Sequence, residues 1–157
     1  MRKTKTKEKR IKITIQSLAS NTFIPSRYFL QRWVNKALSK QVGTNAVNIR
    51  LVSKKESAAL NSTYRHKNGP TNILSFPFEP PPGVSSAFLG DLVICAPLVN
   101  QQAKQQAKTP LTHWAHLVIH GCLHLIGYDH VHDKDATKME TLEIKLLEEL
   151  GYENPYI

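Results

Sequence analysis

The sequence predicts an α+β fold in which helices pack on a mixed four-stranded sheet. Four short segments have the alternating or continuously apolar residues of strands, and five longer segments have the apolar stripes or end signals of helices. In chain order they read strand, helix, strand, helix, strand, strand, helix, helix, helix, an order that favours a mixed sheet. Because no linker divides them, we expect residues 11–157 to form a single domain.

The four predicted strands differ in how much of their surface they should bury. Ile11–Ile15 and Val47–Leu51 alternate apolar with polar residues, so each should bury one face. Asn72–Phe78 has a proline near its end, which favours a position at the edge of the sheet. Leu89–Cys95 is apolar enough to be central, and the glycine–aspartate pair inside it predicts a bulge or a turn.

Five helices are expected from their apolar stripes and from the residues at their ends. They are Pro25–Lys40, Ser53–Tyr64, Ala96–Lys108, a fourth with Pro110 as its first residue, and a fifth that runs to Leu150. A capping box at Ser53 starts the second helix, while Thr109 should cap the fourth and Asp133 the fifth. Ala96–Lys108 is expected to face solvent, and the polar segment Arg65–Pro70 is expected to form a loop.

The net charge of +9 is unevenly distributed along the chain. Residues 1–12 carry seven Lys or Arg against one acidic residue, and residues 13–110 carry eleven against three. Residues 111–157 reverse the balance, with eight acidic residues against three basic ones. The front half is therefore predicted to face a polyanion, and such a surface favours nucleic acid through a salt-sensitive attraction that is independent of base sequence.

The N-terminal segment and the cysteines bear on the cellular compartment. Met1–Arg10 is basic and poor in apolar residues, so we expect a disordered extension. No apolar run approaches the ~18 residues of a membrane span, and no signal-peptide core follows the basic start. Cys95 and Cys122 form no CxxC pair and suit a reducing compartment. These features predict a cytoplasmic protein that does not enter a membrane.

Three histidines, His120, His124 and His130, are spaced so that one metal ion could collect them. In a helix, His120 and His124 lie on one face with Cβ atoms ~5–6 Å apart. His130 falls ~240° further round an ideal helix, so it joins them only if the helix ends and the chain turns back. Gly127 lies where that end is needed, because glycine readily adopts the left-handed conformation that ends helices.

A second ligand set would combine His116 and His120 with another group. His116 cannot share an ion with His120 and His124 together, because two helical turns separate the outer pair by ~12 Å. We favour His120, His124 and His130, since Gly127 supplies the turn. The other histidines of this region are interpreted as ordinary core or surface residues: His113, His116 and His132.

The spacing of the three histidines matches the HExxHxxGxxH pattern of metzincin peptidases except at Gly121, where those enzymes have glutamate. That glutamate is their general base, so its absence argues against peptide hydrolysis. Three histidines without a fourth protein ligand leave an open position, as in catalytic zinc sites, where the pKa of a bound water falls to ~7. Arg65 is a candidate for stabilising the charge of a phosphate substrate, and the alternative interpretation is a solvated charge in a loop.

Four further side chains near the histidines have simpler interpretations. Cys122 lies ~200° from His120 around the helix and should be in the core, as should Cys95. Asp129 and Asp133 could orient a ligand imidazole, but acidic residues beside a helix start are more often caps.

The segment His120–His130, HGCLHLIGYDH, strongly resembles the signature of the YbeY family, bacterial rRNA maturation factors described as metal-dependent, single-strand-specific endoribonucleases. Three further segments carry the likeness: Leu60–Arg65, Pro70–Pro77 and Leu89–Cys95. The resemblance covers nearly the whole chain after residues 1–10. It implies that the three histidines bind one zinc ion per chain and that Arg65 serves catalysis. Asn68 departs from the family, which often has aspartate there.

The resemblance implies a zinc-dependent endoribonuclease that cleaves single-stranded RNA in small-subunit rRNA maturation and ribosome quality control. Its partners would be rRNA, the small ribosomal subunit and ribosome-associated proteins, and either water or the substrate's 2′-hydroxyl could attack. Two alternatives stay open. A metallopeptidase-like hydrolase fits the spacing but lacks the glutamate. A non-catalytic ribosome-assembly factor with a structural metal fits the basic front half.

Overall fold

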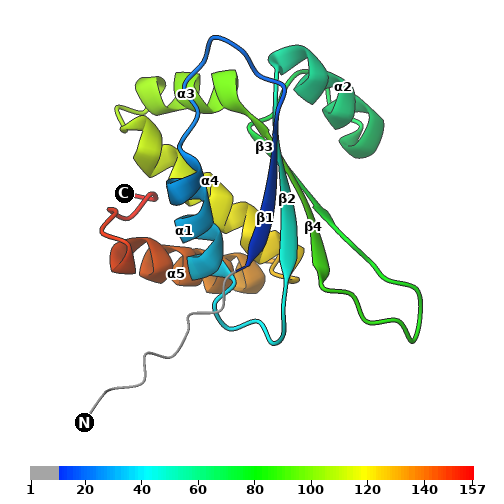
Figure 1. The fold of residues 1–157 in the computed structure, drawn as a ribbon. Coiled ribbons are helices and arrows are strands. Elements are labelled where there is room, and N and C mark those ends of the chain that lie inside the picture. The colour runs from blue at the N-terminus through cyan, green and yellow to red at the C-terminus, as the bar shows by residue number, and fades with distance from the viewer. Residues whose placement is uncertain (1–10) are drawn as a thin grey trace.

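The computed structural model of the protein describes residues 11–157, and the disorder predicted for Met1–Arg10 lies outside them. The predicted α+β fold and its order of elements are confirmed (Figure 1). The strands are β1 (Lys12–Ser17), β2 (Ala46–Val52), β3 (Ile73–Pro77) and β4 (Phe88–Cys95). The helices are α1 (Arg27–Ala37), α2 (Lys54–Arg65), α3 (Ala96–Gln105), α4 (Pro110–Leu125) and α5 (Asp133–Glu149). None of the helices in this part of the chain has the length and hydrophobicity needed to cross a membrane.

The sheet is mixed, with the strand order β1-β2-β4-β3. β1 and β4 each pair parallel with β2, and β3 pairs antiparallel with β4 at the edge of the sheet. The edge position predicted for β3 and the central position predicted for β4 are therefore confirmed. β3 and β4 can pair antiparallel because only a loop connects them. The parallel pairs need longer connections that contain a helix.

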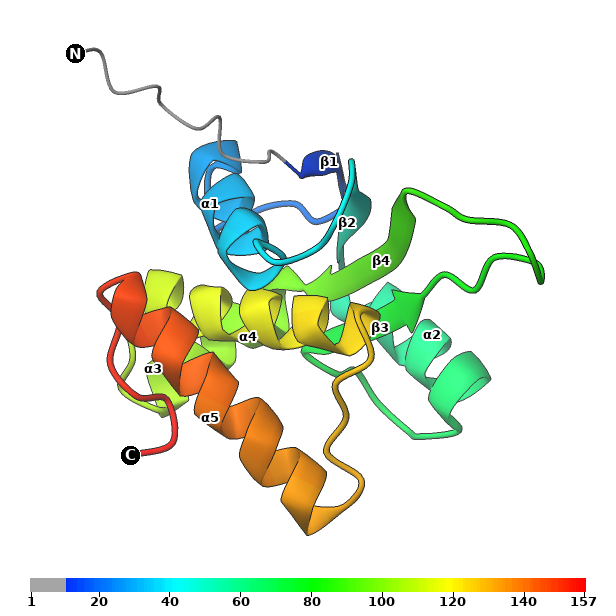
Figure 2. The ribbon, with the colours of Figure 1, turned by 90° about the horizontal axis from the view of Figure 1, so that it is seen from below.

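Helices α1 and α4 lie side by side on one face of the sheet, which we call the inner face, and α5 packs on α4 (Figure 2). The apolar residues of the strands' alternating patterns point to this face: Ile13, Val47, Ile49, Leu51, Leu92 and Ile94. Trp33 of α1 and Trp114 of α4 are fully buried against them. On the other face, the outer face, α2 covers a smaller cluster made by Val52, Leu74, Val93 and Cys95.

The bulge predicted in the fourth strand is present at its start. The register between β2 and β4 slips between Ala46 and Val47, which pair with Phe88 and Gly90. Gly90 has φ +145°, and a Cβ there would lie 2.3 Å from the backbone oxygen of Phe76 on β3. Only glycine lets the two strands approach this closely at this backbone angle.

Replacement of Gly90 by alanine should therefore destabilise the protein strongly. Left-handed strain costs about 1–3 kcal/mol, and displacement of the paired strand adds a similar amount. We expect Gly90→Ala to lower the free energy of unfolding by about 2–5 kcal/mol, measured by urea denaturation. Gly83→Ala is the control for a positive φ alone, because Gly83 has φ +79° and open space around it. Equal losses in both variants would show that the contact with β3 contributes nothing.

Three local predictions were wrong. Arg65 is the last residue of α2 and not part of the loop, because the helix continues until His66 adopts a left-handed conformation. α3 does not simply face solvent, since Ala96, Val99 and Ala103 are fully buried. Its alanines allow α3 to approach α4 closely. The N-cap of α5 is His132, so Asp133 is the first helical residue and favours the helix through its charge.

The caps predicted for two other helices are confirmed. The Ser53 hydroxyl accepts a hydrogen bond from the backbone N–H of Glu56, at 3.2 Å. The Glu56 side chain does not complete the capping box, because it pairs with Arg50 at 2.7 Å. Thr109 accepts from the backbone N–H of Thr112 at the start of α4.

Candidate metal centre

Helix α4 carries three histidines along one face, and its C-terminal end turns a fourth back toward them. The helix ends in a Schellman motif, in which the N–H of Gly127 donates to His124 (3.1 Å) and the N–H of Tyr128 to Leu123 (3.0 Å). Gly127 has φ +101°, so the helix stop predicted at this glycine is confirmed. The reversal brings the His130 ring to 5.7 Å from that of His120 and 5.1 Å from that of His124.

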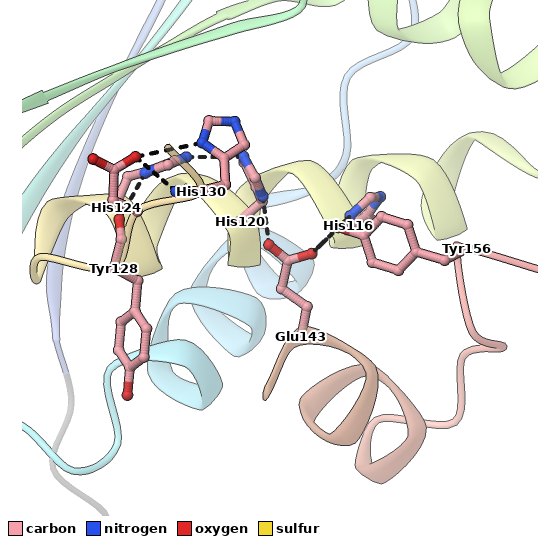
Figure 3. Close-up of polar contacts among 8 residues, drawn as sticks. His116, His120, His124, Tyr128, His130, Glu143 and Tyr156 are labelled. Atoms are coloured by element: carbon pink, nitrogen blue, oxygen red, sulfur yellow. Dashed lines mark hydrogen bonds and ion pairs between the residues drawn. The ribbon is translucent and has the colours of Figure 1, made fainter. Parts of the chain in front are cut away.

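The nitrogens of His120, His124 and His130 converge on one point (Figure 3). One ring nitrogen from each lies within 4.8 Å of the others, and the Nε2 atoms of His120 and His124 are 3.0 Å apart. Two nitrogens bound to one tetrahedral zinc ion at ~2.1 Å lie ~3.4 Å apart. The geometry of this cluster therefore fits a single metal ion.

Hydrogen bonds at the far side of two rings determine which nitrogen is free. The Nδ1 of His124 contacts the backbone oxygen of Tyr128 at 2.8 Å, and the Nδ1 of His120 contacts the carboxylate of Glu143. Both oxygens are acceptors only, so both Nδ1 atoms carry a proton, and the neutral form of each ring presents its Nε2 lone pair. Burial, followed by the neighbouring His120, lowers the pKa of His124 and so favours its neutral form.

Two lone pairs 3.0 Å apart repel one another unless a cation lies between them. His124 is in the last turn of α4, where the helix dipole also favours positive charge. The arrangement of donors is thus suited to a metal ion that accepts imidazole nitrogen.

Glu143 of α5 is the residue of this site that the sequence interpretation missed. Its side chain has no exposed surface, yet it accepts hydrogen bonds from His120, from His116 (3.1 Å) and from the Tyr156 hydroxyl. Burial alone would raise the pKa of Glu143, but the hydrogen bonds from the two histidines outweigh it and lower the pKa to about 2. Glu143 is therefore a buried carboxylate that holds His120 in place.

One signal in the sequence could have identified Glu143. It lies four residues after Met139 and four before Leu147, both of which are buried, so it interrupts the apolar stripe of α5. A lone carboxylate in such a stripe needs a partner, because burying an unpaired charge is costly.

His116 is not an ordinary histidine, because it shares the Glu143 carboxylate with His120. The C-terminal segment closes this cluster, since the Tyr156 hydroxyl contacts both Glu143 and the His116 Nε2 (3.3 Å). Lys108 holds the segment through a hydrogen bond to the Pro155 oxygen. His116, His120 and Glu143 form a second group whose atoms could also hold a metal ion. Ordinary hydrogen bonds account for these contacts without one.

A cavity of about 720 Å³ lies over the three convergent histidines. Its opposite wall is formed by Arg65 at the end of α2 and by Ser75 and Pro77 on the inner face of β3. The guanidinium Nη2 of Arg65 donates to the Ser75 backbone oxygen at 3.1 Å. The structure therefore brings Arg65 together with the three histidines, although Arg65 precedes each of them by 55 or more positions in the sequence.

Comparison with known proteins identifies the family. The model of the YbeY endoribonucleases matches residues 6–151 of this chain. The chain belongs to the YbeY family. The fold also matches the solution structure of TM1509 from Thermotoga maritima, with a TM-score of 0.55 and 28% sequence identity over 88% of this chain and 91% of that one.

In this YbeY chain, Gly121 faces the sheet and not the metal cluster. A Cβ at this position would lie 2.7 Å from Ile73 and 2.9 Å from Leu92, and 3.2 Å from the Ser75 hydroxyl. The contact leaves no room for a glutamate like that of the metzincins, so the site lacks their general base for a physical reason.

The remaining candidates near the site have structural roles. Cys122 and Cys95 are buried as predicted, and burial raises the pKa of the Cys122 thiol to about 12. Asp129 accepts a hydrogen bond from the backbone N–H of His130 at 2.7 Å, while its contact with the His130 ring is a longer 3.4 Å. Asp129 thus shapes the turn more than it orients the ring.

Proposed function

We propose that this chain is a zinc-dependent endoribonuclease that cleaves single-stranded RNA in small-subunit rRNA maturation and ribosome quality control. One observation carries the proposal: in a member of an endoribonuclease family, three imidazole nitrogens converge at a cavity that also receives a guanidinium. Residues 11–157 would act as one metal-hydrolase domain. A role on ribosomal RNA implies a cytoplasmic protein whose partners include the small subunit and its associated proteins.

His120, His124 and His130 would hold the ion. His120 and His124 are oriented by the Glu143 carboxylate and the Tyr128 carbonyl, whereas His130 approaches from the turn after α4. Three imidazoles and no thiolate suit zinc, and three protein ligands leave a coordination position open, as catalytic zinc sites require. When bound, zinc would supply a Lewis acid for a phosphate oxygen and lower the pKa of a water molecule.

Arg65 would bind the phosphate that is cleaved. A guanidinium has five N–H donors, and the Ser75 carbonyl takes a hydrogen bond from only one of its nitrogens in the described structure. The other donors can make a two-point contact with phosphate oxygens, and they would stabilise the negative charge that grows there during the reaction. The hydrogen bond to β3 keeps the Arg65 side chain directed at the cavity.

Replacement of Arg65 by alanine should lower RNA cleavage by about tenfold to a hundredfold, because the developing negative charge loses a hydrogen-bond donor. The protein should stay folded, because Arg65 is exposed. Cleavage of a labelled single-stranded RNA by zinc-loaded protein measures the effect, with a duplex of the same sequence as comparison. Arg32→Ala is the matched control, since Arg32 is an exposed arginine of α1 that does not line the cavity.

The proposal requires that wild type and Arg32→Ala cut the single strand equally, that duplex resists, and that a chelator stops the reaction. Equal cleavage by wild type, Arg65→Ala and chelated protein would identify a contaminating nuclease and refute the assignment.

A further inference from the structure

Four aromatic side chains gather on the outer face of the sheet beside β3. They are Tyr64 at the end of α2, Phe76 on β3, Phe78 just after it and Phe88 at the start of β4, and we call them the aromatic patch. The rings of Tyr64 and Phe76 are 5.3 Å apart, and those of Phe78 and Phe88 are 5.4 Å apart. Phe76 packs on the outer-face cluster, and Phe78, two residues further along the same hydrogen-bonded edge, points to the same face by the alternation of a strand.

The patch leaves flat apolar surface in contact with water. Tyr64 is 59% exposed and Phe78 is 44% exposed. Grouped exposed rings of this kind mark interaction sites more often than scattered single ones do.

The patch adjoins the metal cavity across a single strand. Tyr64 immediately precedes Arg65, and Phe76 lies between Ser75 and Pro77, which line the cavity from the inner face of β3. Because β3 is the edge strand and successive side chains alternate between faces, the cavity and the patch lie on opposite sides of the same edge. A flexible strand of RNA can pass around this edge from one to the other.

The charge at the Tyr64 end of the patch favours an anionic occupant. Arg65 and Lys67 line the cavity beside Tyr64, whereas Asp91 pairs with Phe76 across the ladder and Glu79 follows Phe78, so the basic charge lies at the Tyr64 end of the patch. Basic side chains next to exposed rings are the combination that single-stranded nucleic acid needs, since the former hold the phosphates and the latter stack with the bases. An apolar protein surface would use the rings but not the charges.

We propose that the aromatic patch is a base-stacking subsite for the nucleotides that flank the phosphodiester held in the cavity. The inference rests on the proposed endoribonuclease function and adds the residues that bind the bases. It also supplies a reason for a preference for single strands, because the bases of a duplex are already stacked on one another and cannot reach Tyr64.

The test measures cleavage of single-stranded RNA by zinc-loaded full-length protein with Tyr64→Ala, Tyr64→Phe and Phe78→Ala. Tyr64→Ala should lower kcat/KM about fivefold to a hundredfold, mainly through KM, the range expected when one base loses its aromatic partner. Tyr64→Phe should restore activity because it keeps the ring. Tyr28→Ala on α1, where Tyr28 is 68% exposed, is the control and should behave as wild type.

A substrate series identifies stacking directly. Each RNA of the series lacks one base, at a different position. At one of these positions, the missing base should lower cleavage by wild type but should not further lower cleavage by Tyr64→Ala. A variant that merely displaced Arg65 would not show this coupling. If Tyr64→Ala and Phe78→Ala cleave naked RNA as well as wild type, the stacking subsite is refuted and the patch serves a protein partner. If wild type cleaves no RNA, the proposed function itself fails.

Discussion

Replacement of His124 by alanine is expected to abolish RNA cleavage while leaving the protein folded. The imidazole is only half-buried, and its polar contacts go to the Tyr128 carbonyl and to the neighbouring His120 ring, so the core does not depend on it. The loss of a metal that stabilises the reacting phosphate costs several kcal/mol, which corresponds to a rate at least ~10³-fold lower. Cleavage of single-stranded RNA and zinc content by atomic absorption measure the two effects.

Thermal melting of the same variant separates an enzyme from a protein with a structural metal. Zinc should raise the Tm of wild type, since a ligand that binds only the folded state stabilises it, and it should not raise the Tm of His124→Ala. His132→Ala is the control, because His132 is exposed and its side chain makes no capping hydrogen bond. A His124→Ala protein that is unfolded at room temperature would support the structural-metal alternative instead.

Replacement of Glu143 by glutamine is expected to weaken zinc binding by about tenfold to a hundredfold. Glutamine keeps the shape of the side chain but not the charge, so it holds the Nδ1 proton of His120 less firmly. The affinity can be measured by competition with a chromophoric chelator. RNA cleavage should fall in parallel at limiting zinc and recover when zinc is in excess.

Glu140→Gln is the matched control for Glu143→Gln, because Glu140 lies on the same helix with its side chain in water. We expect its zinc affinity to equal that of wild type. A Glu143→Gln protein that binds zinc as tightly as wild type would show that Glu143 stabilises the fold alone. Should Glu143→Gln lose its folded structure in a thermal melt, Tyr156→Phe offers a milder test, since it removes one hydrogen bond to the carboxylate and leaves His120 in contact.

Much of the fold could be predicted because it follows from local patterns. The alternating apolar residues of β1 and β2, the proline of β3 and the caps at Ser53 and Thr109 act within a few positions of the chain, so they can be recognised without knowing the tertiary structure. The predictions were weaker where long-range packing decides. The small side chains of α3 were predicted to face solvent, but packing against α4 buries several of them.

By itself, the sequence determined that His120, His124 and His130 could meet, because helical periodicity and the conformational freedom of Gly127 are properties of adjacent residues. Only the tertiary structure decided what surrounds them. Packing of α5 on α4 brings Glu143 to His120, and the edge strand β3 directs Arg65 into the same cavity. Contacts between distant segments depend on how whole elements pack, which no local pattern encodes.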